Sequence, residues 1–152
     1  MSFTGEYSAK LNAKNQVTLP SALREAVFLL EEALPLVLFA RDDEDFVEIY
    51  PQSEWRKVQQ KTALLAREKR MPELNRLLNM RAYSFTLDSE GNGRILIPPP
   101  LMGTFKDSSD LVFIGNTNRI ECWEAGKFRL RYGRDSVVDA RFRAELSEIL
   151  DF

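Results

Sequence analysis

An internal repeat is the feature that most restricts how this chain of 152 residues can fold. Several short phrases occur twice, in the same order along the sequence. In the first half they are YSAKLN (from residue 7), VTLP (17), VLFA (37) and EIYPQSEW (48). Their counterparts in the second half are YSFTLD (83), ILIP (95), VFIG (112) and ECWEAGKF (121). Because a repeat changes the architecture open to a chain, these matches predict two copies of one unit.

Each copy predicts the same two opening strands. Residues 5–11 alternate loosely in hydropathy, which favours a strand, and a short turn follows. The apolar, β-branched residues 17–19 and 95–97 predict a second strand in the two copies. A proline ends that strand both times, because proline lacks the N–H that a β-ladder needs.

The segments after these prolines differ between the copies. Residues 21–34 carry apolar side chains at positions 23, 26, 27 and 30, which predicts a helix with Ser21 as its N-cap. The counterpart, PPPLMGTFKDS, predicts one short helical turn at most, because prolines and a glycine interrupt it. A hairpin then follows in each copy, 36–40 with 46–50 and 111–115 with 119–123.

Two amphipathic segments lie beside the repeated phrases. Residues 53–81 predict a helix that is interrupted at Pro72. Its first part has helical spacing, with the cations on the opposite face, at Trp55, Val58, Thr62 and Leu65. Its second part, 73–80, is expected to bury Leu74, Leu77 and Leu78. A second stripe near the C-terminus consists of Val138, Phe142, Leu146, Ile149 and Leu150. Such a stripe docks on the protein's own core or on a neighbouring subunit more readily than on a ligand.

Composition argues against an enzyme, a membrane protein and a secreted protein. The chain has no histidine, the commonest general base and metal ligand, so we expect no catalytic site, no metal and no cofactor. The single cysteine, Cys122, suits a reducing compartment and a place in the core. The longest apolar run, 34–40, is far shorter than the roughly 20 residues that cross a bilayer. We therefore expect a cytoplasmic protein without a membrane or small-molecule partner.

Charge is distributed unevenly, although the net charge is only −2. Residues 56–81 hold eight cations and two anions, a pattern typical of a solvated helix face and also compatible with a nucleic-acid surface or a subunit contact. The loop DDED at 42–45 concentrates the opposite sign, and such a loop is either exposed to solvent or able to bind Mg²⁺.

The turns between the paired strands are the candidate functional elements. NAKNQ at 12–16 and EGNGR at 90–94 each contain residues that adopt positive φ at little cost: Asn15 in the first copy, and Gly91, Asn92 and Gly93 in the second. They are either hairpin turns alone or devices that aim a side chain. An acidic or amide side chain that opens such a turn hydrogen-bonds its own backbone, which would orient the residue four positions later. An arginine there suits a phosphate or the O6/N7 edge of guanine.

These motifs resemble those of the MraZ family, bacterial regulators of the division and cell wall gene cluster. GEYSAKLNAKNQVTLPSALREA is similar to the opening of that family, LDSEGNGRILIPPPL to the start of its second repeat, and EIYPQSEWRKV to the end of its first. The resemblance implies an α+β fold, two tandem AbrB/SpoVT-type swapped-hairpin repeats in an interleaved, barrel-like core with peripheral helices. It also implies a ring homo-oligomer that binds operator repeats in double-stranded DNA, through an Asp-x-x-x-Arg motif in each repeat.

This chain departs from the family pattern at that motif. Asn12 stands where the family has aspartate, Gln16 where it has arginine, and Asn15 where it has glycine. In the second copy Arg94 is present, with Glu90 rather than Asp88 four residues before it. In the first copy Asn12 and Asn15 can still form the turn, but the arginine of the motif is replaced by the uncharged Gln16. The candidate DNA-binding residues are therefore Lys10, Asn12, Lys14, Asn15, Gln16, Asp88, Glu90 and Arg94.

The expected units are a first repeat with its helical extension (1–81), a second repeat (82–133) and a C-terminal amphipathic helix (134–152). Two classes of function remain open. The first is a sequence-specific DNA-binding transcriptional regulator, expected to be a repressor in the cytoplasm and associated with the nucleoid. The second is a ring-forming interaction protein with weakened or lost DNA binding, or an antitoxin-like regulator of the same fold. An enzyme is disfavoured, because no nucleophile–base pair is visible.

Overall fold

The computed structural model describes residues 2–41, 45–87, 91–105 and 108–151. Its strands are β1 (Glu6–Lys10), β2 (Gln16–Thr18), β3 (Leu36–Ala40), β4 (Phe46–Tyr50), β5 (Ala82–Phe85), β6 (Arg94–Leu96), β7 (Asp110–Asn116) and β8 (Arg119–Glu124). Its helices are α1 (Ser21–Phe28), α2 (Gln52–Glu68), α3 (Glu73–Met80), the 3₁₀ helix η1 (Pro99–Phe105), α4 (Ala125–Tyr132) and α5 (Val137–Leu150). The α+β class and both hairpins predicted from the sequence are confirmed.

The two halves of the chain exchange their first strands. β1 pairs antiparallel with β7 of the second half, and β5 pairs antiparallel with β3 of the first half. The β3–β4 and β7–β8 hairpins meet along β4 and β8, which gives a six-stranded sheet in the order β1-β7-β8-β4-β3-β5. β2 and β6, one from each half, form a separate two-stranded ribbon. Since β1 and β5 end the sheet, the described strands form an open sheet and a ribbon, where a barrel-like core was expected.

The main core joins the sheet to the ribbon and to the two short helices. Val17 and Ile95 of the ribbon, Leu23 of α1 and Leu101 of η1 belong to one cluster of buried residues. Cys122 lies in the same cluster, and burial raises the pKa of its thiol. The thiol therefore stays protonated and packs as a small apolar group, as the sequence suggested.

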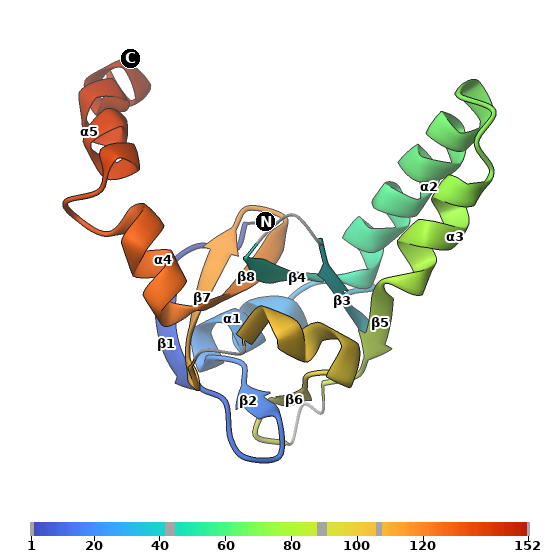
Figure 1. The fold of residues 1–152 in the computed structure, drawn as a ribbon, viewed down its shortest axis with the longest axis horizontal. Helices are drawn as coiled ribbons and strands as arrows, with labels where there is room; N and C mark the ends of the chain where they lie inside the picture. Colours follow the sequence, from blue (N-terminus) through green and yellow to red (C-terminus); the bar gives the residue numbers. More distant parts are fainter. Residues whose placement is uncertain (1, 42–44, 88–90, 106–107, 152) are drawn as a thin grey trace.

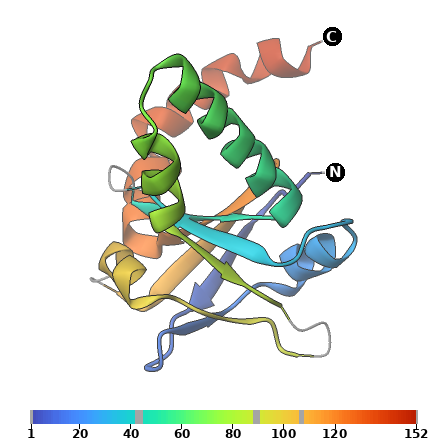
Figure 2. The same ribbon diagram turned by 90° about the vertical axis from the view of Figure 1, so that its right-hand side faces the viewer.

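Two helical arms extend from opposite ends of the sheet, α2–α3 on one side and α4–α5 on the other (Figures 1 and 2). Only the bases of the arms pack closely: the Trp55 ring of α2 lies 5.3 Å from that of Tyr50, and the Trp123 ring lies 5.7 Å from that of Phe128 in α4. None of the helices in the described part of the chain is long and apolar enough to span a membrane.

The outer parts of both arms expose their apolar side chains. In α5, Phe142 is 52% exposed and Ile149 55% exposed, so this stripe does not dock on the core of its own chain. The alternative, docking on a neighbouring subunit, stays a prediction. The prediction of a buried α3 face is also wrong, because Leu77 is exposed and Leu74 is only half-buried. Helical spacing identifies which residues share a face, but it does not say whether a second surface covers that face.

Helix α1 ends six residues before the predicted boundary, at Phe28. The carbonyls of Glu32 and Ala33 accept hydrogen bonds from the N–H groups of Ser53 and Gln52, so this segment leaves the helix to satisfy the free donors at the start of α2. Ser21 is the first helical residue and makes no capping bond, since Pro20 is the N-cap.

In the second half, η1 is longer than the single turn predicted from its prolines. It spans seven residues and buries Leu101 and Phe105. Burial of these two side chains stabilises the helical segment, although its prolines and glycine have low helix propensity.

Candidate nucleic-acid interface

The two turns identified in the sequence lie at the two ends of the β2–β6 ribbon, on the side of the molecule opposite the helical arms (Figures 1 and 2). Gln16 pairs with Leu96 and Thr18 with Arg94 in the antiparallel register, and Val17–Ile95 is the pair between them. Val17 and Ile95 are buried, so alternation turns their neighbours on both strands outward. The ribbon therefore presents a face of Gln16, Thr18, Arg94 and Leu96 to solvent.

Asn12 organises the first turn through its side chain. Its Oδ1 accepts hydrogen bonds from the backbone N–H groups of Lys14 and Gln16, both at 2.9 Å. Its Nδ2 donates to Oε1 of Gln16 at 3.1 Å, which holds the Gln16 side chain against the turn. Asn15 takes a φ of 60°, the left-handed conformation that asparagine tolerates. The turn-forming roles predicted for Asn12 and Asn15 are confirmed.

The second turn is held from outside by helix α1. Gly93 has a φ of 73° and is buried, and the Asn92 side chain accepts a hydrogen bond from the Arg94 N–H at 3.3 Å. The guanidinium of Arg24 donates to the carbonyls of Asn92 and Leu19, so one side chain joins this turn to the end of β2. A Cβ on Gly93 would collide with that guanidinium. The candidate residues Asp88 and Glu90 lie outside the described residues.

Arg24 is the residue at this interface that sequence reasoning missed. It lies within the helical pattern after Pro20, and the aligned position in the second half is Met102. Its hydrogen bond to Asn92 joins residues 68 positions apart, and no local pattern reports such a contact. The one available signal was the charge itself, because Arg24 is the single cation of the SALREAVF segment.

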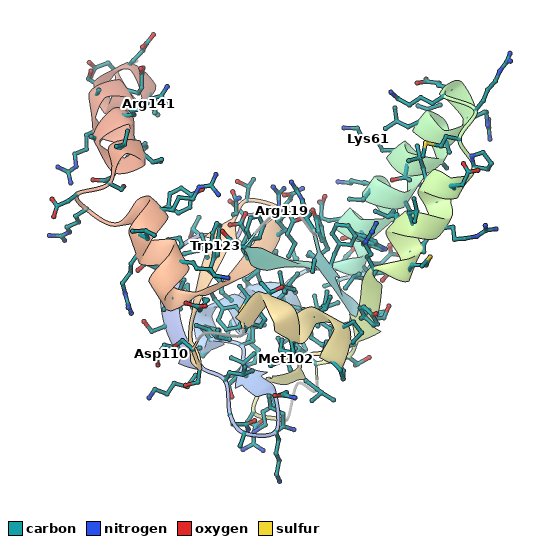
Figure 3. All side chains as sticks on the ribbon, viewed as in Figure 1. Lys61, Met102, Asp110, Arg119, Trp123 and Arg141 are labelled. Atoms are coloured by element: carbon teal, nitrogen blue, oxygen red, sulfur yellow. The ribbon has the colours of Figure 1, made fainter. Side chains whose placement is uncertain are left out.

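The structure brings together most, but not all, of the candidate cations. Lys14 and Arg94 are exposed at opposite ends of the ribbon. Lys10 ends β1 in the six-stranded sheet, and its Nζ lies 3.8 Å from the carboxylate of Asp110 on the flank of the sheet (Figure 3). Lys10 thus shares its charge with an anion, whereas Lys14 and Arg94 make no ion pair within the described part of the chain. The positive charge of the ribbon face rests on those two residues.

Comparison with known proteins identifies the family. The sequence model of the family described as "MraZ protein, putative antitoxin-like" matches residues 78–136. A transcriptional regulator MraZ from Thioalkalivibrio sulfidiphilus is 32% identical over 125 residues, which cover 80% of this chain and 79% of that protein. The chain belongs to the MraZ family. Proteins of the same name from Shewanella sediminis, 27% identical, and Clostridium acetobutylicum, 29% identical, each match at least 97% of this chain and 98% of their own length.

The resemblance to MraZ predicted from the sequence is therefore confirmed, and the similar proteins are named as transcriptional regulators. The segment that matches the MraZ family model, 78–136, includes β6 and Arg94 and begins well after the first turn. The first turn, in which both Asn12 and Gln16 differ from the Asp-x-x-x-Arg pattern, thus lies outside that match.

Proposed function

We propose that this protein is a sequence-specific DNA-binding transcriptional regulator that represses the bacterial division and cell wall gene cluster. The observation that carries the proposal is the β2–β6 ribbon, which has the two repeat turns at its ends on the same side of the molecule and exposes Arg94 on its outer face, with Lys14 exposed in the first turn. Membership of the MraZ family supports it independently.

The dimensions and chemistry of the ribbon suit duplex DNA. A two-stranded β-ribbon fits the major groove, where arginine pairs with O6 and N7 of guanine. Arg94 is the side chain for that role, and Lys14 is placed to neutralise a phosphate. Gln16 uses one lone pair of its Oε1 on Asn12 and keeps its amide donors, so it retains the groups that pair with adenine.

The repeat units of this proposal are 1–81 and 82–133, built as AbrB/SpoVT-type swapped hairpins, with 134–152 as a C-terminal helix. The exchanged strands β1 and β5 and the shared ribbon support this division. Copies of the chain assemble into a ring homo-oligomer, which lets several ribbons contact operator repeats at once. The protein then acts in the cytoplasm, associated with the nucleoid.

Fluorescence anisotropy tests the proposal. Duplexes from upstream of the host's own division cluster should bind more tightly than random duplexes of equal length. Binding should weaken steeply with salt, because each neutralised phosphate adds about 0.9 to the slope of log K against log salt. Equal and weak binding of both duplexes at two salt concentrations would refute sequence-specific regulation.

A second candidate function is a ring-forming interaction protein of the same fold with weakened or lost DNA binding, or an antitoxin-like regulator of that fold. The uncharged Asn12–Gln16 pair in the first turn favours it, since that turn has lost the cation of the family motif. The same titration decides between the two functions.

A further inference from the structure

The β2–β6 ribbon has two chemically different ends. Gln16 and Arg94 are equivalent residues of the two repeats, and so are Thr18 and Leu96, which lie two positions later. Because the strands are antiparallel, each end joins the earlier position of one repeat to the later position of the other. Gln16 therefore pairs with Leu96 at one end, and Thr18 pairs with Arg94 at the other. Identical repeats would give identical ends, whereas this chain has a neutral end and a cationic end.

Leu96 gives the neutral end an apolar group. Its side chain is 60% exposed, and in the strands that the structure describes no other large apolar side chain is exposed to that extent. Its neighbours Ile95 and Ile97 are buried, so alternation along β6 places Leu96 on the outer face with Arg94. An apolar side chain in this position gains free energy only when another apolar group covers it.

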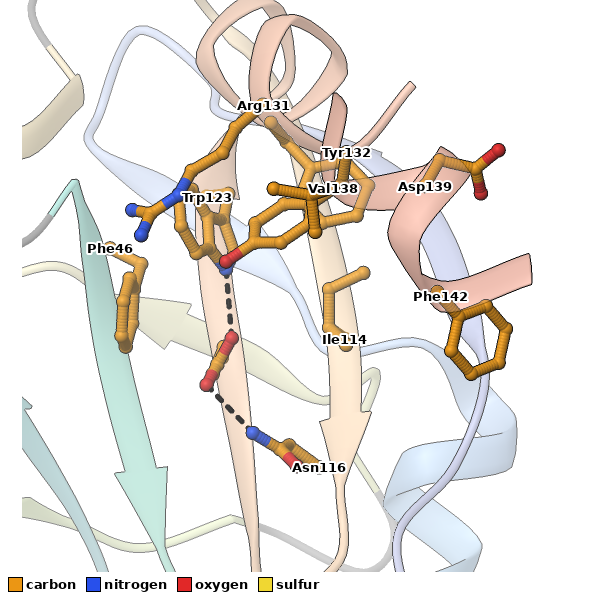
Figure 4. Close-up of a pocket in the computed structure, with 11 residues that line it drawn as sticks. Phe46, Ile114, Asn116, Trp123, Arg131, Tyr132, Val138, Asp139 and Phe142 are labelled. Carbon is orange, nitrogen blue, oxygen red and sulfur yellow. Dashed lines mark hydrogen bonds between the residues drawn. The ribbon is translucent and has the colours of Figure 1, made fainter. Parts of the chain in front are cut away.

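The other exposed apolar side chains lie mostly on the helical arms, away from the ribbon. A cavity of about 560 Å³ between the sheet and the α4–α5 arm is lined by Trp123, Tyr132 and Phe142, among others (Figure 4). The arms extend on the side of the molecule opposite the ribbon (Figures 1 and 2). Leu96 is therefore separate from that apolar surface, and a group that covers Leu96 belongs to whatever binds the ribbon.

The neutral end matches the major-groove edge of an A·T pair. Adenine presents N7 and N6 to a glutamine amide, and its thymine partner presents an apolar C5-methyl group. Asn12 Nδ2 donates to Oε1 of Gln16, which holds the amide in place and leaves its N–H donors for adenine. In such a cross-strand pair the Cβ atoms are about 4.5–5.5 Å apart, so one base pair can meet both Gln16 and Leu96.

The cationic end lies close enough to read a neighbouring base pair. The two ends are two residues apart along each strand, which is about 6.8 Å at about 3.4 Å per residue. Successive base pairs of DNA are also about 3.4 Å apart, so side chains at the two ends reach bases about two steps apart, or about three with the length of arginine. The pair between them, Val17 and Ile95, is buried and makes no contact with the groove.

We propose that the two ends of the ribbon read different base pairs, Arg94 a G·C pair and the Gln16–Leu96 pair an A·T pair within three steps of it. Leu96 is the specificity residue that packs on the thymine methyl group. A ribbon with unlike ends reads its site in one direction, so the contacted sequence is not palindromic. The inference rests on the DNA binding in the proposed function and adds the base preference of the ribbon.

Uracil substitution tests the contact at Leu96, because it removes only the methyl group of thymine. In a duplex that the protein binds specifically, each thymine is replaced in turn and affinity is measured by anisotropy. At the contacted thymine, affinity should fall roughly fourfold, the effect of one buried methyl group. Leu96→Ala, an exposed change, should bind the thymine and uracil duplexes equally. Leu130→Ala, the same change on α4 at an 86% exposed position, should keep the difference.

Substitution with 7-deazaguanine tests the other end, because it removes only the N7 acceptor that arginine binds. At the contacted guanine, affinity should fall roughly tenfold or more, the effect of a hydrogen bond to a charged group. Arg94→Ala should lose this sensitivity and keep the sensitivity to uracil, whereas Leu96→Ala should show the reverse. The sensitive guanine and thymine should lie within three base pairs of each other.

The outcomes distinguish this inference from the proposed function. Specific binding without a uracil-sensitive thymine would overturn the inference and leave the regulator function standing. The same holds if Leu96→Ala keeps the uracil sensitivity, or if the sensitive guanine and thymine lie more than three base pairs apart. Equal binding of specific and random duplexes would overturn both.

Discussion

The two turns at the ends of the ribbon are stabilised by different hydrogen bonds. The first turn is held from within, because Asn12 binds two backbone N–H groups and the side chain of Gln16. The second turn is held from outside, by Arg24 of helix α1. Each arrangement fixes the residue that opens the following strand, Gln16 in one copy and Arg94 in the other.

The comparison shows that such a turn can form without a charged side chain at its last residue. In the first copy Asn12 and Gln16 form a neutral amide pair at the Asp-x-x-x-Arg spacing, and their side chains are hydrogen-bonded to each other. Replacing one aspartate and one arginine leaves the net charge of the turn unchanged. The first turn therefore loses its arginine fork without becoming more acidic, and Lys14 still supplies one cation.

The largest effect on DNA binding should come from Arg94→Ala. If the second turn provides the base contact, affinity for the specific duplex should fall by about 1–3 kcal/mol, and the salt slope should decrease. Gln16→Ala should cost less and leave the salt slope unchanged, because glutamine neutralises no phosphate. Anisotropy of both variants at two salt concentrations measures this, and the reverse order of losses would place the main contact on the first turn.

Arg24→Gln should have the next largest effect, since it removes the link between the second turn and β2. We expect affinity to fall by about 1 kcal/mol, the typical worth of a hydrogen bond, with the salt slope unchanged because Arg24 positions Arg94 rather than binding a phosphate. Arg56→Gln, which breaks an ion pair between α2 and Glu32, is the matched control. A salt slope lowered by about 0.9 would instead show that Arg24 contacts DNA directly.

The sequence predicted those parts of the fold that depend on local patterns. Alternation and terminal prolines located the strands, and the spacing of Asn12, Asn15 and Gln16 predicted how the first turn is formed. Contacts between segments that are distant in the sequence could not be predicted from these patterns. The early end of α1 depends on hydrogen bonds between residues 32–33 and the start of α2. The second turn is stabilised by a hydrogen bond from Arg24, which is 68 positions away from Asn92. The exposure of the α5 stripe was missed because periodicity does not reveal whether a partner covers a face.

The smallest effect should come from Asn12→Asp/Gln16→Arg, which restores the family's charged pair in the first turn. The aspartate can accept the same two backbone N–H groups as Asn12, so we expect the free energy of unfolding, measured with denaturant, to change by less than about 1 kcal/mol. The added arginine should increase the salt slope by at most about 0.9 per bound ribbon, because its aspartate partner shares the charge. Gln16→Arg alone lacks that partner and should bind more tightly at low salt than the double variant. If neither variant changes the affinity or the slope, the first turn does not face the duplex, and the contrast between the two turns concerns folding only.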